Sequence, residues 1–383
     1  MAQRHLDPTD SRPRPVGTAP TGDALAGYLR DQATEFLRAL RLHRETGSGA
    51  NGSEASAEAA RALRRSARRI SASLHTFQPL LDSDWCETMR PELAWVSGTL
   101  AMEHAYTARL ERLLTALHRL SGSTAFPAQA PGRDATAGSR ADAHASGRAP
   151  GAAPALPSTA PRDAGPRTAP ASERGSLTVG AAKAGALLDR QLTLARTRAH
   201  STALQALGSS RFHAVADKVA VLASEVPLLA TAAASDLRPH ATAAEERLTD
   251  AVTALPLVTA GHPYNAAALV HGLSPDTVPH PQDAPWHQVR LLLRLHRYAR
   301  EALTGPKGNA AVDLRLLSAG QALNQHRDAS EAAAAAAQAA RTPRIAPATA
   351  YALGVLHADQ RHEVEAARFA FQQAWQKETV GAS

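Results

Sequence analysis

The segment of residues 121–176 places the strongest constraint on the fold, because prolines and glycines recur there every few positions and large apolar side chains are nearly absent. Proline lacks a backbone N–H and glycine is costly to order, so neither a helix nor a strand propagates through such a segment. We therefore predict a long flexible linker that joins two halves, residues 23–120 and residues 177–378. Residues 1–22 are rich in proline, threonine and arginine without periodicity, which predicts a disordered tail.

Both halves of the chain carry apolar residues at helical spacing, and no segment alternates in the manner of a strand. Aromatic residues make up only 4% of the chain and alanine dominates the apolar set, which favours helices packed through small side chains over an all-β fold. We therefore predict an all-α fold in which the alanine run after Glu331 is a packing surface within a helix. A first helix, capped by Thr21 or Asp23, is expected to end near Thr46. The further helices are predicted near residues 54–81, 85–119, 178–208, 211–225, 230–254, 286–303, 310–340 and 347–378.

Several classes of protein are excluded by what the sequence lacks. Cys86 is the only cysteine, which excludes an internal disulfide framework and a multi-cysteine zinc site. The sequence contains no P-loop, no GxGxxG, no GxSxG and no HExxH motif. No uncharged run approaches the ~20 apolar residues that a membrane span needs, and the first residues lack the apolar region of a secretory signal. We therefore predict a soluble, cytoplasmic monomer that is not an enzyme and has no catalytic residues, no metal site and no cofactor.

The charge balance is basic, with 42 Lys and Arg residues against 35 Asp and Glu residues and a formal net charge of +7. Arginine supplies nearly all of the positive charge, and its planar fork of donors suits phosphate oxygens. The composition therefore indicates a polyanionic partner, which could be nucleic acid, a phosphorylated small molecule or polyphosphate. A GC-rich genome would also enrich alanine, arginine, glycine and proline together. Composition alone therefore does not separate a polyanionic partner from a genomic bias, and the placement of the arginines along the chain has to distinguish the two.

The basic residues gather on one face of each of two amphipathic segments, residues 61–81 and residues 286–303. On a helical wheel, the basic face of the first segment carries Arg61, Arg64, Arg65, Arg68 and His75, with Arg69 at its edge. The basic side of the second segment carries His287, Arg290, Arg294, Arg297 and Tyr298. The two rows begin with the same spacing, three residues and then four. Like charges on one helical face repel one another, so the pattern favours a bound anion, although the solvated face of an ordinary amphipathic helix can show similar stripes.

Two segments, RALRRSARRISASLHTFQPLLD and WHQVRLLLRLHRYAREAL, resemble the two basic helices of the CHAD domain, the conserved histidine α-helical domain. TGDALAGYLRDQATEFL is similar to the first helix of that family, and PELAWVSGTLAMEHAYTARLERL to the helix that follows the first basic helix. QALNQHRDASEAA, together with the segment from Ile345 to Trp375, looks like the closing pair of helices. The resemblance covers residues 23–378 apart from the linker.

The resemblance implies two pseudo-symmetric helical bundles that face each other across a basic groove. It also implies a non-catalytic module that binds inorganic polyphosphate and resides on polyphosphate granules. The second half matches the family motif at His287, Arg290, Arg297, Tyr298 and Glu301, with Arg294 where the family often has lysine. His326 and Asp328 match the histidine and aspartate of the closing segment.

The first half departs from the family pattern and is degenerate. Arg61 stands where the family has its histidine, Ser71 replaces an arginine, and residues 104–107 have lost both carboxylates of the usual R-D-L-D segment. The predicted polyphosphate-binding residues are Arg61, Arg64, Arg65, Arg68, Arg69, His75, His287, Arg290, Arg294, Arg297, Tyr298 and His326. The alternatives are a helical scaffold whose ligand function has decayed and a nonspecific binder of polyanions or nucleic acid, while a phosphohydrolase is the least favoured.

Overall fold

The computed structural model describes residues 21–46, 53–122, 171–257, 259–262, 281–304 and 313–376. The predicted all-α fold is confirmed, since the described residues form helices and, apart from two isolated bridges, no strands. The α-helices are α1 (Gly22–Thr46), α2 (Ser53–Thr76), α3 (Ser83–Ser121), α4 (Ala171–Leu207), α5 (Ser210–Ser224), α6 (Arg238–Thr253), α8 (Ala284–Thr304), α9 (Leu314–Ala340) and α10 (Pro347–Gln376). Short 3₁₀ helices are η1 (Gln78–Leu80), η2 (Thr259–Gly261) and η3 (Pro281–Asp283).

The main differences from the predicted helix bounds occur at prolines. The helix predicted over residues 54–81 ends at Thr76, and a 3₁₀ turn that contains Pro79 follows. The helix predicted over residues 230–254 begins only at Arg238, with Pro239 in its first turn. Proline cannot donate the backbone hydrogen bond of a helix interior, but it is tolerated in the first turn, where that donor has no partner.

The linker and the tail fall largely outside the described residues, since these omit residues 1–20 and 123–170. At the edges of the predicted linker, α3 continues to Ser121 and α4 begins at Ala171. The last residues assigned to the linker are therefore already helical.

Three hydrophobic cores hold the helices together, and their grouping crosses the predicted halves of the chain. The first core joins α1, α2, the start of α3 and α5 to the start of α6 and the end of α8, and its buried members include Phe36, Ile70 and Phe212. The second joins the end of α3 to α4, α9 and α10, and the third joins α6, α8, α9 and the end of α10 around Trp286. Because α5 follows the linker in sequence and yet shares a core with α1 and α2, the packing does not follow a division at the linker.

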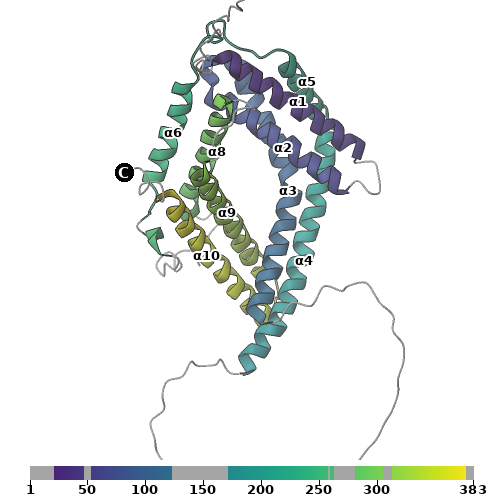
Figure 1. The fold of residues 1–383 in the computed structure, drawn as a ribbon. Helices are drawn as coiled ribbons and strands as arrows, with labels where there is room; N and C mark the ends of the chain where they lie inside the picture. The colour runs from purple at the N-terminus through teal and green to yellow at the C-terminus, as the bar shows by residue number, and fades with distance from the viewer. Residues whose placement is uncertain are drawn as a thin grey trace, which may run out of the picture.

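The helices α3 and α4 run side by side as a long pair, and α8, α9 and α10 lie across from α2 (Figure 1). Ion pairs tie α3 to the second group of helices: Arg109 Nη2 donates to Glu331 Oε2 of α9 at 2.5 Å, and Arg119 Nη2 donates to Asp359 Oδ1 of α10 at 2.7 Å. One face of the alanine run of α9, with Ala332, Ala333 and Ala336, is buried and forms the predicted packing surface, on which α9 and α10 pack closely. These contacts join α3, α9 and α10, while α8 packs directly against α2.

Gly180 marks the closest approach between α4 and the start of α10. A Cβ atom at this position would lie 2.1 Å from the carbonyl oxygen of Ala348, so Gly180→Ala forces one of the two backbones to shift. We expect a loss of roughly 1–3 kcal/mol in the free energy of unfolding, measured by urea denaturation. The control Gly27→Ala, where a Cβ meets nothing within 4 Å, should instead gain about 0.5–1 kcal/mol from helix propensity. A neutral or stabilising effect of Gly180→Ala would contradict the close packing.

Candidate functional site

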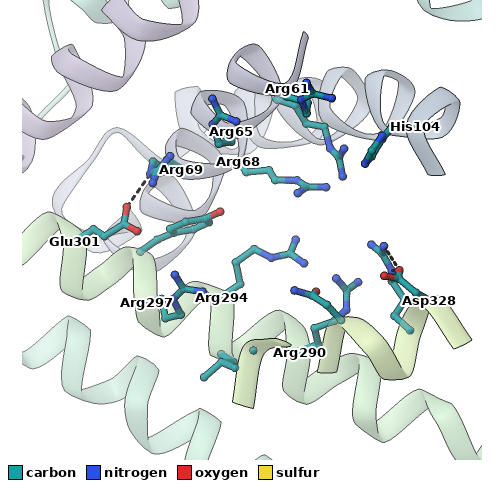
Figure 2. Close-up of a pocket in the computed structure, with 16 residues that line it drawn as sticks. Arg61, Arg65, Arg68, Arg69, His104, Arg290, Arg294, Arg297, Glu301 and Asp328 are labelled. Carbon is teal, nitrogen blue, oxygen red and sulfur yellow. Dashed lines mark hydrogen bonds and ion pairs between the residues drawn. The ribbon is translucent and has the colours of Figure 1, made fainter. Parts of the chain in front are cut away.

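The helices α2 and α8 each bury an apolar stripe and present arginines on the opposite side. In α2, Leu63, Ile70 and Leu74 are fully buried, while the arginines between them project from the other face. A cavity of about 480 Å³ lies between α2, α3, α8 and α9 (Figure 2). We call it the arginine groove, and its lining residues are Arg61, Arg64, Arg65, Arg68, Arg69, His104, Arg290, Leu293, Arg294, Arg297, Tyr298, Glu301, Gly320, Asn324, Arg327 and Asp328.

At the centre of the arginine groove, several arginines form no ion pair with a carboxylate of the described residues. Arg68 and Arg294 reach into the same space from α2 and α8 (Figure 2). Arg64 and Arg290 each bury their Nε atom without a hydrogen-bond partner in the described part of the chain. Arg294 and Arg297 likewise form no ion pair with any described residue, so at least four guanidinium groups remain available to an anion.

Burial makes the positive charge of the central arginines energetically costly, as their lowered pKa values show. It lowers the pKa of Arg68 to about 9 and the pKa of Arg290 to about 10, and the nearby positive charge of Arg294 acts in the same direction on both. Both side chains therefore stay charged at neutral pH, but they do so at an energetic cost that a bound anion would relieve. The pKa of Arg64 is lowered for the same reason, burial, with further contributions from Arg327 and Arg294.

Carboxylates engage the arginines at one end of the groove. Arg69 Nε donates to Glu301 Oε2 at 2.7 Å, and the hydroxyl of Tyr28 donates to the same oxygen at 3.4 Å. The guanidinium of Arg69 also lies 5.6 Å from the centre of the Tyr298 ring. Burial lowers the pKa of Arg69, but Glu301 outweighs this effect and raises it overall. This cluster joins α2 to α8 and orients Arg69.

Two further ion-pair clusters lie along the rim. On α2, Glu58 accepts from Arg61 Nε at 2.7 Å and from Arg65 Nη2 at 2.9 Å. At the opposite end of the groove from Glu301, Arg327 pairs with Asp328 on α9 (Figure 2). The rim arginines are therefore partly neutralised, whereas the central arginines are not.

Nine of the twelve predicted site residues line the arginine groove. These are Arg61, Arg64, Arg65, Arg68, Arg69, Arg290, Arg294, Arg297 and Tyr298. The three predicted histidines, His75, His287 and His326, are not among its lining residues.

His75 lies two helical turns beyond Arg68 and lines a separate cavity with residues of α6. His287 is half-buried, its Nε2 has no partner among the described residues, and burial lowers its pKa. Its ring centre lies 5.6 Å from that of His326, which is itself fully buried. None of the three histidines is therefore among the lining residues of the arginine groove, and their part in polyphosphate binding stays a prediction.

His326 belongs to a buried ionic network instead. Asp283, which is fully buried, accepts from Arg361 Nη1 at 2.7 Å, from Arg368 Nη2 at 2.7 Å and from Ser330 Oγ at 2.5 Å. Arg368 also donates through Nε to His326 Nε2 at 3.3 Å. This network joins η3 at the start of α8 to α9 and α10, and so it helps to place the arginine row of α8.

Some residues that line the groove were not among the predicted polyphosphate-binding residues. Gly320, Asn324 and Arg327, together with Asp328, come from α9 and line the groove beside α8. Positions 320, 324, 327 and 328 lie on one face of a helix, so the sequence spacing alone could have grouped these residues. His104 of α3 also lines the groove, at the position where the family motif is lost.

Within the described ranges, no three His, Cys, Asp or Glu residues form a group that could hold a metal ion. No helix in the described part of the chain is long and apolar enough to cross a membrane.

Comparison with known proteins identifies the family of this chain. The model of the CHAD domain matches residues 31–337, and comparison with curated proteins gives no match. The solved structure of PptA from Streptomyces chartreusis is 71% identical in sequence, and the alignment covers 94% of this chain and 100% of that chain with a TM-score of 0.71. The family match extends over most of the chain, including the helices that build the arginine groove, and the chain therefore belongs to the CHAD domain family.

Proposed function

We propose that this protein is a non-catalytic receptor for inorganic polyphosphate, which it binds along the arginine groove. The observation that carries the proposal is the unneutralised centre of the groove, where Arg64, Arg290, Arg294 and Arg297 have no carboxylate partner among the described residues. The CHAD family is known to bind polyphosphate, which supports the same assignment.

The chemistry of the groove suits a linear chain of phosphates. Guanidinium groups donate paired hydrogen bonds to phosphate oxygens, and such charge-assisted bonds are roughly twice as strong as neutral ones. Arginines from α2, α8 and α9 surround the cavity, so successive phosphates of one polymer can engage different helices at the same time. We place the protein in the cytoplasm as a monomer that associates with polyphosphate granules.

The double variant Arg290→Ala, Arg294→Ala tests this assignment. Each charge-assisted hydrogen bond contributes about 1.5–3 kcal/mol, so we expect the affinity for labelled polyphosphate to fall by on the order of 100-fold. Binding should be titrated from low salt to about 200 mM salt, where the slope of log affinity against log salt should become shallower by roughly one to two in the variant. If the double variant kept the wild-type affinity, the arginine groove would not be the polyphosphate-binding site.

The matched control is Arg38→Ala, Arg41→Ala, which removes the same charge from exposed positions of α1. Within the described residues, Arg38 pairs with Glu35 and Arg41 with Glu45 on the same helix, and the two arginine side chains are 68% and 83% exposed. This control should bind polyphosphate nearly as the wild type does. Duplex DNA, added as a competitor, separates the alternatives: equal binding of both polymers would indicate a nonspecific polyanion binder, and no binding of either would indicate a helical scaffold.

A further inference from the structure

A second cavity lies where α2 ends and α6 packs beside it. Its volume is about 520 Å³, within the range of small-molecule sites, and it shares no lining residue with the arginine groove. Its lining residues are His75, Thr76, Gln78, Pro79, Leu81, Ser83, Leu229, His240, Ala243 and Arg247. Because His75 follows Arg68 by seven residues on α2, the two sites are about 10 Å apart along that helix.

Two residues that line this cavity, His75 and Thr76, have buried polar atoms that lack partners among the described residues. Thr76 is 5% exposed, yet its hydroxyl makes no hydrogen bond within the described residues, and the same holds for Nδ1 of His75. Several other helical threonines bond to the carbonyl oxygen four residues earlier; Thr34 and Thr107, for example, do so at 2.8 Å and 3.1 Å. A buried hydroxyl without such a bond lacks the partner that buried polar groups normally have, and a small shift of the side chain would let a ligand supply it.

The outer part of the cavity is positively charged and partly apolar. Arg247 is exposed and forms no ion pair with any described residue. His240 lies two turns earlier on the same face of α6, and its ring makes a T-shaped contact with Phe77 at 6.2 Å between centres. No aspartate or glutamate lines the cavity, whereas Leu81 and Leu229 supply apolar surface. Burial and the charges of Arg90 and Arg247 lower the pKa of His75, so its ring is neutral at pH 7.

We propose that this cavity binds a small phosphorylated metabolite that carries a hydrogen-bonding organic part, of which a nucleoside monophosphate is the simplest probe. The phosphate would pair with Arg247 and His240 at the mouth of the cavity. The organic part would lie against Leu81 and Leu229, within reach of the Thr76 hydroxyl and of Nδ1 of His75. The proposal is independent of polyphosphate binding, because the two sites share no residue.

Calorimetric titration of the full chain with AMP, adenosine and inorganic phosphate tests the proposal. The double variant Arg290→Ala, Arg294→Ala serves as the background, so that phosphate binding in the arginine groove is weakened. In this background we expect AMP to bind more tightly than either adenosine or phosphate alone. Arg247→Ala should weaken AMP binding at least tenfold, and Thr76→Val, which keeps the shape of the side chain, should weaken it severalfold.

The control is Arg238→Ala, an exposed position in the first turn of α6 that pairs with Asp236 and does not line the cavity. It should leave AMP binding unchanged. The proposal is overturned if AMP does not bind at millimolar concentration, if phosphate alone binds as tightly as AMP, or if Arg247→Ala and Arg238→Ala behave alike. Polyphosphate binding by the wild-type groove is measured separately, so a failure of one proposal does not count against the other.

Discussion

Replacement of Asp283 by alanine should lower the free energy of unfolding by about 3–5 kcal/mol, because it leaves two buried guanidinium groups without their common partner. Asp283 is fully buried and accepts hydrogen bonds from Arg361 and Arg368, whose side chains are only 4% and 6% exposed. The pKa of Asp283 is held well below its usual range: burial acts to raise it, but the hydrogen bonds and the positive charge around the carboxylate outweigh burial. Burying a single charge costs far more than burying a balanced set.

Urea denaturation of Asp283→Ala and of a matched control measures this effect. Asp236→Ala removes an aspartate that pairs with Arg238 at the surface, where such pairs contribute about 0–1 kcal/mol. Equal losses in the two variants would show that the buried network does not stabilise the fold. Asp283→Asn should fall between them, since it keeps the shape of the side chain and loses its charge.

Acidification from pH 6.5 to pH 4 should cost the protein about 3 kcal/mol of stability through His326 alone. Burial lowers the pKa of His326 to about 4, and its ring stacks on Trp286 at 5.6 Å between centres. Arg368 Nε donates to its Nε2, which therefore accepts as the unprotonated nitrogen of a neutral ring. In the unfolded chain the same histidine takes up its proton near pH 6.5.

The direction of this effect follows from the protons bound by each state. Between pH 6.5 and pH 4 the unfolded chain binds the His326 proton and the folded chain does not, so stability falls with falling pH through this window. The stability of His326→Gln should depend less on pH than that of the wild type, because the variant lacks the contribution of His326. This comparison of slopes holds whatever the stability of the variant at pH 7. His118→Gln, at an exposed position of α3, should keep the wild-type dependence. Indistinguishable pH profiles for wild type and His326→Gln would argue against a neutral buried ring.

Much of the helical architecture could be predicted from local sequence. The helix over residues 286–303 occurs as α8 at Ala284–Thr304, and the start of the last helix, predicted at residue 347, agrees with α10. Such bounds depend on interactions between neighbours in sequence, namely apolar spacing, capping and proline. The errors at Pro79 and Pro239 are local too, since each proline displaced a helix end by several residues.

The candidate site was predictable where it depends on one helix at a time. The arginine rows of α2 and α8 could be recognised from spacing, and they do line one groove. Their ion pairs could not be predicted in this way, because Glu301 is 232 residues from Arg69 in sequence and the two meet only through packing. The same limit explains why Arg327, on a third helix, was missed.

The sequence by itself determined that the chain is all-α, that two of its helices carry a row of arginines on one face, and that it resembles the CHAD family. Only the tertiary structure decided which arginines lie in one groove without an ion-pair partner, and which of the predicted residues line that groove. His75 shares the basic stripe of α2 yet lines another cavity, and His326 is enclosed by Asp283 and Arg368. The physical reason is that helical periodicity sets only the direction of a side chain about its own axis, whereas its neighbours, burial and charge balance depend on how distant helices pack.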